Sequence, residues 1–217
     1  MDILKKHEIF EIEVLEALNN GKLLDPLVFG GGTMLRLCYD LQRYSSDLDF
    51  WFLKDVDSKA YFNKMREHLK KSYELTDAQV KFYTLLFEFR SAKYPKRLKI
   101  EIRKTPTKCD YEDRIAFSKY DTRQVVVKVF TLEEAMKRKM GAALDRKDIR
   151  DFFDIEFLLR KGAPIGALDT NKEALLKILG SFKADDYRVT LGSALDSDLR
   201  NFYIKNGFSY LLTKLKD

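Results

Sequence analysis

A run of three glycines limits most strongly how this chain can fold. Gly30, Gly31 and Gly32 follow the short apolar run 27–29 and precede a stretch in which apolar residues recur with helical spacing. A short apolar run that ends in glycines predicts a buried strand entering a tight loop. The next residue, Thr33, is expected to cap the helix. Backbone N–H groups and the helix dipole favour a phosphate at such a helix start, and glycine lets the phosphate approach the backbone.

Two aspartates separated by one residue follow this loop and helix. The segment 47–52 alternates polar and apolar residues, which predicts a strand. Asp47 and Asp49 then share the outer face, about 7 Å apart along the strand, and the apolar residues face the core. Carboxylates spaced in this way suit Mg²⁺, which shares its remaining coordination positions with phosphates. The segment therefore predicts a metal site beside the glycine loop; a strand with a merely acidic outer face is the alternative.

The strand expected at 97–103 carries the candidate for a third carboxylate. Its apolar residues face the core, so Lys99, Glu101 and Arg103 share the other side. We expect Glu101 to serve as a metal ligand or as the general base. A surface ion pair of Glu101 with Lys99 or Arg103 explains the residue equally well, and Glu88 on the neighbouring strand is the second choice for this role.

A charged residue interrupts the apolar stripe of the helix that begins with the capping box 131–134. Lys139 lies in that stripe, so it must reach solvent, pair with an acid or bind an anion. Arg146 lies on the same face, and the next helix offers Asp151 and Asp154 one turn apart. We expect Lys139 and Arg146 to contact phosphates and Asp151 to orient Lys139 or the attacking hydroxyl. An ordinary salt bridge between the two helices is the alternative.

The hydrophobic patterns divide the chain into two parts without a linker rich in glycine, serine or proline. We predict an α+β protein, with a mixed β-sheet flanked by helices over residues 1–128 and a helical domain over 129–217. The expected elements are helices at 3–18, after Thr33 and at 58–71, strands at 27–29, 47–52, 79–90, 97–103 and 125–130, and helices from 131 with breaks at 161–164, near Gly180 and near 206–207.

The composition excludes several kinds of site. With only two cysteines and two histidines among 217 residues, a disulfide framework, a cysteine-rich zinc site, a Ser-His-Asp triad and a histidine metal centre are not expected. The formal net charge of +6 permits a polyanionic partner such as RNA. Neither a signal peptide nor an apolar run of about 20 residues is present, so we expect a cytoplasmic protein without a membrane partner.

Together these motifs resemble the AbiEii/AbiGii-type nucleotidyl transferase toxins of the polymerase-beta-like nucleotidyltransferase superfamily. The resemblance implies a minimal nucleotidyltransferase fold with an appended helical domain that completes the active site. It further implies Mg²⁺-dependent transfer from a nucleoside triphosphate with release of pyrophosphate, a toxin role in a toxin–antitoxin or phage-defence system, a cognate antitoxin protein, and an RNA acceptor such as the 3′ end of tRNA. The motifs that carry it are Gly31-Gly32-Thr33, Arg43-x-Ser45-x-Asp47-Leu48-Asp49, Lys139 and Arg146-x-x-x-Arg150-Asp151-x-x-Asp154.

Each matching position acquires an implied role from this resemblance. The implied roles are metal binding for Asp47 and Asp49, phosphate binding for Gly31, Gly32 and Thr33, nucleotide binding for Arg43 and Ser45, and catalysis by the second domain for Lys139 and Asp151.

Two other functions remain open at this stage. The basic stretch 93–104, with Tyr94 and Tyr111 available to stack on bases, would also suit a non-catalytic nucleotide- or RNA-binding module. A nucleotidyltransferase that modifies a small hydroxyl compound is the other possibility.

Overall fold

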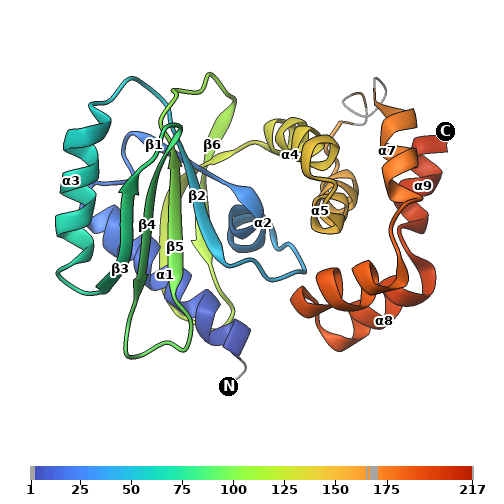
Figure 1. Cartoon of the computed structure of the whole chain (residues 1–217), viewed down its shortest axis with the longest axis horizontal. Helices are drawn as coiled ribbons and strands as arrows, with labels where there is room; N and C mark the ends of the chain where they lie inside the picture. Colours follow the sequence, from blue (N-terminus) through green and yellow to red (C-terminus); the bar gives the residue numbers. More distant parts are fainter. Residues whose placement is uncertain (1–2, 165, 167–170, 217) are drawn as a thin grey trace. The chain divides into compact units, whose positions relative to one another are not determined.

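The computed structural model describes residues 3–164, 166 and 171–216. The chain forms two compact units: a sheet unit made of Met1–Asp40 and Tyr44–Phe130, and a helical unit made of Leu41–Arg43 and Thr131–Asp217. The elements of the sheet unit (Figure 1) are α1 (Ile3–Asn20), β1 (Leu27–Gly30), α2 (Gly31–Tyr39), β2 (Asp47–Phe52), α3 (Ser58–Leu69), β3 (Glu74–Val80), β4 (Thr84–Arg90), β5 (Leu98–Arg103), β6 (Tyr111–Phe117) and β7 (Gln124–Phe130).

The sheet has seven strands in the order β3-β4-β5-β2-β1-β7-β6. Strand β2 pairs antiparallel with β1 and parallel with β5, and β1 pairs parallel with β7. The prediction of a mixed sheet with flanking helices is therefore confirmed. Strand β2 has the bounds predicted for it, and its central position places its side chains between those of β1 and β5.

One face of the sheet is apolar and packs against helices. On α3, Phe62 stacks on Phe87 of β4 with ring centroids 4.9 Å apart, and Phe10 of α1 contacts Phe89 of the same strand edge to face. The apolar residues of β2 are almost completely buried, as the alternation predicted. The opposite sides of β2 and β5 therefore carry the polar residues of both strands.

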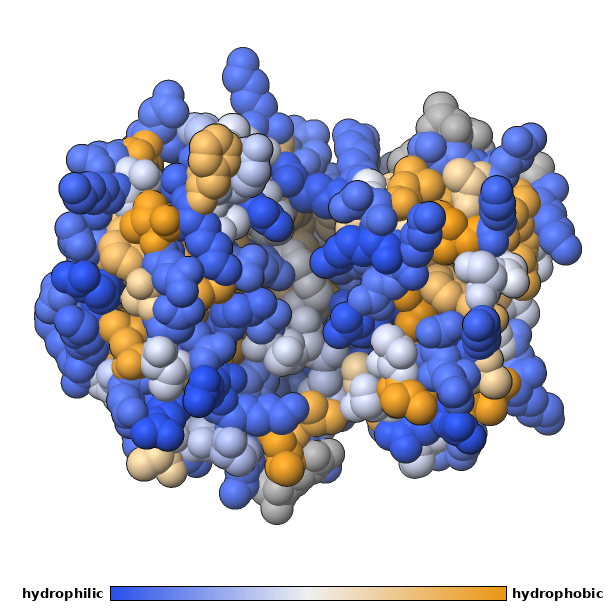
Figure 2. Space-filling model, in the orientation of Figure 1, coloured by the Kyte–Doolittle hydropathy of each residue, from blue (hydrophilic) through white to orange (hydrophobic). Residues whose placement is uncertain are grey.

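The polar residues extend over the surface of the sheet unit. In Figure 2, hydrophilic side chains cover most of the visible face of this unit, and apolar ones form small separate groups. Such scattered apolar residues are normal on a protein surface.

Two parts of the sheet differ from the sequence prediction. The stretch 79–90 was predicted as one strand, but a turn at residues 81–83 divides it between β3 and β4. Strand β3 begins earlier, at Glu74, and β6 was not predicted. Both β3 and β6 lie at the edges of the sheet. Because much of an edge strand is exposed, its sequence need not alternate apolar and polar residues, and the periodicity is lost.

In the helical unit, Thr131 caps α4 (Leu132–Arg146) as predicted, and its hydroxyl accepts a hydrogen bond from the backbone N–H of Glu134. The buried carboxylate of Glu156 on α5 (Ile149–Arg160) accepts hydrogen bonds from the Tyr203 hydroxyl and from the backbone N–H of Leu211, and so connects two later helices, α8 (Ser197–Asn206) and α9 (Ser209–Lys216), to α5. Among the described residues no helix has the length and apolar character needed to cross a membrane. The elements of this unit are α4 (Leu132–Arg146), α5 (Ile149–Arg160), α7 (Lys172–Leu179), a π-helix (Asp186–Leu191), a 3₁₀ helix (Gly192–Ala194), α8 (Ser197–Asn206) and α9 (Ser209–Lys216).

Candidate active site

The three predicted carboxylates lie on two neighbouring strands of the sheet unit. Asp47 and Asp49 are half-buried on the same side of β2. In the parallel register of β2 and β5, Asp49 lies opposite Glu101, and Asp47 lies opposite Lys99. Residues opposite each other on paired strands project to the same face, so the structure brings all three carboxylates to one side of the sheet.

The ammonium group of Lys99 lies among these acids. Its Nζ is 3.1 Å from Oδ2 of Asp47 and 3.2 Å from Oε1 of Glu101. Partial burial opposes the charged form, but the two carboxylates outweigh it and raise the pKa of Lys99. The ion pair of Glu101 with Lys99, which the sequence left open as an alternative, is therefore present.

The carboxylates fit a hard cation by their chemistry. With the side chains as they lie, no group of three or more acidic, histidine or cysteine residues in the described part of the chain is arranged to hold a metal. Lys99 instead provides the positive charge that balances Asp47 and Glu101. Oxygen donors on one side of two paired strands are the type of ligand that Mg²⁺ prefers, so Asp47, Asp49 and Glu101 are suited to it.

The glycine loop lies directly against Asp49. Gly31 has a φ of +76°, and a Cβ atom at this position would come within 2.5 Å of Oδ2 of Asp49. Gly31 is also the first residue of α2, and the N-cap residue before it, Gly30, provides no side-chain cap. The first N–H groups of a helix without such a cap remain available to an anion. The loop therefore has the open backbone that phosphate binding requires, next to a carboxylate.

The prediction that Thr33 caps α2 is wrong. Thr33 lies inside the helix and is fully buried, and its hydroxyl has no hydrogen-bond partner in the part of the chain that the structure describes. The helix begins three residues earlier than expected, because the positive φ of Gly31 lets the chain turn directly from β1 into α2.

Replacing Gly31 with alanine should lower nucleotidyl transfer about 100-fold, because the added methyl group displaces the Asp49 carboxylate and strains a positive φ. The measurement is the initial rate of label transfer, together with the unfolding temperature. Gly141→Ala is the matched control: this position lies in α4, and apart from the adjacent backbone of that helix no atom lies within 4 Å of the new methyl group. The control should retain full activity and gain about 0.5–1 kcal/mol of stability. Equal activity of the two variants would contradict the role of the loop.

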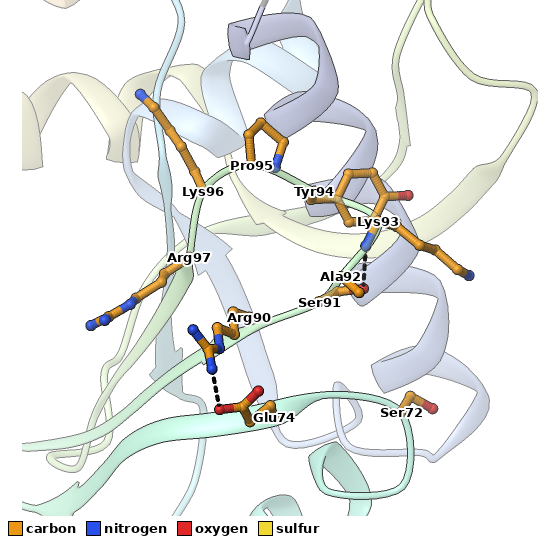
Figure 3. A pocket seen from close by; sticks show the side chains of 10 residues that line it. All are labelled: Ser72, Glu74, Arg90, Ser91, Ala92, Lys93, Tyr94, Pro95, Lys96 and Arg97. Carbon is orange, nitrogen blue, oxygen red and sulfur yellow. Dashed lines mark hydrogen bonds and ion pairs between the residues drawn. The ribbon is translucent and has the colours of Figure 1, made fainter.

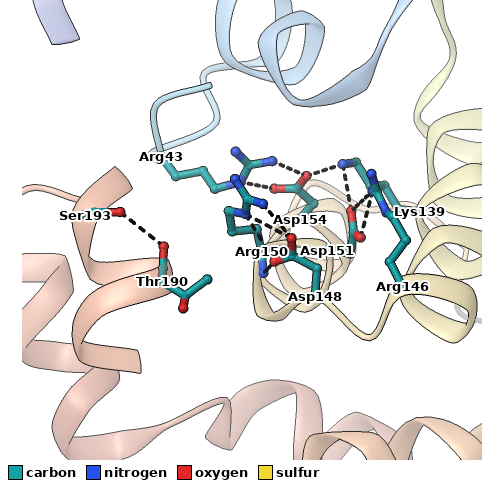
Figure 4. Close-up of polar contacts among 9 residues, drawn as sticks. All are labelled: Arg43, Lys139, Arg146, Asp148, Arg150, Asp151, Asp154, Thr190 and Ser193. Atoms are coloured by element: carbon teal, nitrogen blue, oxygen red, sulfur yellow. Dashed lines mark hydrogen bonds and ion pairs between the residues drawn. The ribbon is translucent and has the colours of Figure 1, made fainter. Parts of the chain in front are cut away.

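In the helical unit, three cationic side chains pair with Asp154 and Asp151 (Figure 4). Lys139 of α4 lies 2.6 Å from Asp154 and 3.1 Å from Asp151 of α5. Arg43 holds the fully buried Asp154 through two hydrogen bonds of 2.6 Å. Burial favours the neutral acid, but Arg43 and Lys139 keep the pKa of Asp154 below its ordinary value.

Arg146, the second predicted phosphate ligand, donates hydrogen bonds to both carboxylate oxygens of Asp151, at 2.8 and 2.9 Å. Its side chain is 58% exposed, whereas that of Lys139 is 12% exposed. Arg146 is therefore the cation of this cluster that solvent and ligands reach most easily. The salt bridge between the two helices, which was the alternative interpretation of Lys139, is therefore present. It also orients the Lys139 ammonium group.

The remaining predicted residues are placed as follows. Arg43 is buried against Asp154, so its guanidinium group already has a partner, and Ser45 is half-buried in the segment before β2. The second choice for the third acid, Glu88, accepts hydrogen bonds from Arg97 and Thr76.

The basic loop between β4 and β5 borders an open pocket of about 690 Å³ (Figure 3). Two features reduce its capacity to bind RNA. Arg90 forms an ion pair with Glu74. The ring of Tyr94 stacks on Phe10 at 4.5 Å, and its hydroxyl donates a hydrogen bond to Glu13. Tyr94 therefore belongs to the packing of α1, and its ring is not free to stack on a base as the binding-module alternative requires.

Two buried polar residues of α1 lie near the start of β2, and the sequence analysis did not single them out. His7 donates a hydrogen bond from Nε2 to the backbone carbonyl of Ser46, and burial lowers the pKa of its imidazole. Glu11 is 3.5 Å from His7, and its Oε1 has no hydrogen-bond partner within the described residues. Burial and the nearby Glu8 raise the pKa of Glu11 well above its ordinary value. The sequence signal for this contact was the spacing of His7 and Glu11, which are four residues apart on a predicted helix and so lie on the same face.

Glu11→Gln should stabilise the protein at pH 8 by about 1 kcal/mol, or about 2–4 °C in unfolding temperature. The folded state holds the Glu11 proton at pH values where the unfolded chain has released it. The contribution of this proton to the free energy of unfolding is fully present below the ordinary pKa of glutamate, and it falls as the pH rises toward the raised pKa of Glu11. The gain should therefore shrink toward pH 4 in thermal unfolding curves. Glu8→Gln is the control and should destabilise, because the Glu8 carboxylate binds Arg36 and Ser118. A gain that does not change with pH would argue against a protonated Glu11.

The fold resembles three solved structures at low sequence identity. The first is a candidate nucleotidyltransferase from H. pylori, with a TM-score of 0.59 and 18% identity over 95% of this chain and 96% of the other. The second is JHP933 from Helicobacter pylori, with a TM-score of 0.53 and 19% identity over 93% of this chain and 94% of the other. The third is MenT4, a nucleotidyltransferase toxin from Mycobacterium tuberculosis, with a TM-score of 0.51 and 16% identity over 97% of this chain and 85% of the other. At such identities the likeness establishes the fold alone. A search of curated proteins gives no match.

The chain thus has the fold of these nucleotidyltransferase structures, with carboxylates on paired strands beside a glycine loop. The family profile described as "Nucleotidyl transferase AbiEii toxin, Type IV TA system" matches residues 13–202. The chain therefore belongs to the AbiEii nucleotidyl transferase toxin family, as its motifs indicated. Its activity is nucleotidyl transfer, and membership of a toxin–antitoxin family implies an antitoxin and a nucleoside triphosphate substrate.

Proposed function

We propose that this toxin transfers a nucleotide from a nucleoside triphosphate to a hydroxyl of RNA, such as the 3′ end of tRNA, and that Asp47, Asp49 and Glu101 hold Mg²⁺ for this reaction. A cytoplasmic location and control by a cognate antitoxin protein are part of the proposal.

One observation carries the proposal: Gly31 lies against the Asp49 carboxylate, and Asp49 lies opposite Glu101. Backbone that is suited to a phosphate and oxygens that are suited to a metal therefore lie together in the sheet, which supports the proposal. Phosphoryl transfer depends mainly on placing the phosphates and on balancing the charge that develops on them. This arrangement supports both requirements.

The proposed reaction forms a bond from the acceptor oxygen to the α-phosphorus. The bond from the α-phosphorus to the bridging oxygen breaks, and pyrophosphate leaves with its electron pair. In its alternative role as the general base, Glu101 accepts the hydroxyl proton, and the N–H groups at the start of α2 bind phosphate oxygens. When bound, Mg²⁺ supplies Lewis acidity and neutralises negative charge. Lys99 balances the carboxylate charge when the metal is absent.

In the helical unit, Lys139 and Arg146 are proposed to neutralise phosphate charge, and Asp151 to orient both cations. Support comes from the ion pairs of Asp151 with each of them. The exposed Arg146 is the better placed of the two to move from the carboxylate to an anion. That this unit completes the active site, and that the domain boundary lies at 128, stay predictions.

The test is an incubation of the protein with Mg²⁺, each of the four α-labelled nucleoside triphosphates in turn, and total tRNA. We expect label on RNA from at least one triphosphate, and loss of this label when EDTA is present. Nuclease digestion then shows whether the labelled nucleotide is terminal. RNA binding without label transfer would favour the non-catalytic module. Label found only on a small molecule would favour the small hydroxyl acceptor.

A further inference from the structure

We propose that the turn between β3 and β4 is the docking platform for a single-stranded end of the RNA acceptor. In this platform Phe82 and Tyr83, here called the aromatic tip, stack on bases, and Lys81, Arg103 and Lys104 contact phosphates. The inference rests on the RNA acceptor of the proposed function and adds where that acceptor binds.

The aromatic tip is unusual for a hairpin turn. The backbone N–H of Lys81 donates to the carbonyl of Thr84 at 2.8 Å, so Phe82 and Tyr83 form a two-residue turn. Glycine, asparagine and aspartate are favoured in such turns. Here the two residues are large, aromatic and 81% and 67% exposed. Their rings meet edge to face at 4.5 Å, which leaves most of the ring surface open. Neither the turn nor the core requires these side chains.

Positive charge surrounds the aromatic tip. Strand β5, which pairs with β4, ends beside the aromatic tip (Figure 1). Its last residue, Arg103, lies opposite Thr84, and the backbone N–H of Lys104 donates a hydrogen bond of 2.9 Å to the carbonyl of Tyr83. Within the described residues, no carboxylate pairs with Lys81, Arg103 or Lys104. The cations Arg90, Arg97, Lys99 and Arg114 on the same sheet all have such partners.

Unpaired cations beside open aromatic rings suit single-stranded nucleic acid. Bases stack on the rings irrespective of sequence, and the cations follow the phosphate backbone. An apolar protein partner would use the rings but would gain nothing from the unpaired cations. The charges therefore favour RNA.

The strand register places the platform near the carboxylates. On β5, Glu101 and Arg103 project to the same side, about 7 Å apart along the strand. Glu101 lies opposite Asp49, and Arg103 lies opposite both Trp51 of β2 and Thr84 of β4. An RNA strand stacked on the aromatic tip thus has a short path along one face of the sheet to the proposed reaction centre.

The test compares the double variant Phe82→Ala/Tyr83→Ala with Phe117→Ala, an aromatic residue that is 42% exposed on the edge strand β6. The probe is a fluorescein-labelled single-stranded RNA of about 12 nucleotides, measured by fluorescence anisotropy without triphosphate. We expect the double variant to bind this RNA about 10- to 100-fold more weakly, and the control to bind within about twofold of the unmodified protein. Thermal unfolding should be unchanged in both, because the substituted rings are exposed.

Steady-state kinetics then separates the two proposals. If the double variant raises KM for the RNA acceptor and leaves KM for the triphosphate unchanged, the platform is supported. If the unmodified protein labels RNA and the double variant keeps its KM and RNA affinity, the platform is wrong while the proposed function stands. If the unmodified protein labels no RNA but its single-strand affinity depends on the tip, the proposed acceptor is wrong, and the tip is an RNA-binding surface but not a docking platform for the acceptor. If the double variant loses as much affinity for a duplex of the same sequence as for the single strand, the proposal that the rings stack on bases is wrong.

Discussion

Asp49→Asn should reduce nucleotidyl transfer by about 100- to 1,000-fold and leave the unfolding temperature within about 2 °C of that of the unmodified protein. Asparagine keeps the shape of the side chain but removes the negative charge that the proposed metal requires. The residue is half-exposed on a strand whose core contacts come from the opposite face, so the fold does not depend on its charge. The measurement is label transfer under single-turnover conditions, with unfolding followed in parallel.

Asp77→Asn is the matched control for this variant. Asp77 is an aspartate on β3 of the same sheet, and its side chain accepts hydrogen bonds from Gln79. Its substitution should leave the transfer rate within about twofold. If the Asp49 variant transfers nucleotides as fast as the unmodified protein, the proposed role of Asp47 and Asp49 in the reaction is wrong.

Asp154→Ala should lower the free energy of unfolding by about 3–5 kcal/mol, or about 6–20 °C in unfolding temperature. The side chain is fully buried and pairs with both Arg43 and Lys139. Truncation therefore leaves two largely buried cations without this partner, a much larger loss than that of a surface ion pair. Thermal or denaturant unfolding at neutral pH measures the difference.

The pH dependence of this loss has a definite sign. Because Arg43 and Lys139 hold the pKa of Asp154 below its ordinary value, its stabilisation is complete at neutral pH and disappears as the pH falls through the lowered pKa. The unfolding temperatures of the variant and the unmodified protein should therefore converge in acid. Asp185→Ala, which breaks an exposed ion pair with Arg188 in the same unit, should cost at most about 1 kcal/mol. If both variants lose a similar free energy of unfolding, the buried ion pairs of Asp154 do not have the predicted importance for stability.

Local sequence patterns were sufficient for the parts of the fold that have a clear period. The alternation in 47–52 predicted β2 at its observed bounds, and Thr131 caps α4 as its motif indicated. Edge strands β3 and β6 lacked that alternation and were merged or missed. The position of Thr33 depended on the backbone conformation of Gly31, which the pattern does not specify.

Partners distant in sequence were the hardest part of the site to predict. The sequence named Asp151 as a residue that could orient Lys139, and in the structure Lys139 pairs with both Asp151 and Asp154. It gave no indication that Tyr94 would stack on α1, or that Lys99 would contact Asp47 as well as Glu101. These contacts follow from the pairing of strands and the packing of helices, which a local pattern does not encode.

The assignment of Leu41–Arg43 to the helical unit has a mechanical consequence. The chain leaves the sheet unit after Asp40 and returns to it at Tyr44, so neither unit is one uninterrupted length of polypeptide. A fragment that stops at Phe130 would keep Arg43 but lose the acid that neutralises it. Only three residues separate that arginine from Asp47. The ion pair of Arg43 with Asp154 on α5 therefore restrains the backbone only a few residues ahead of Asp47, the first of the proposed metal ligands.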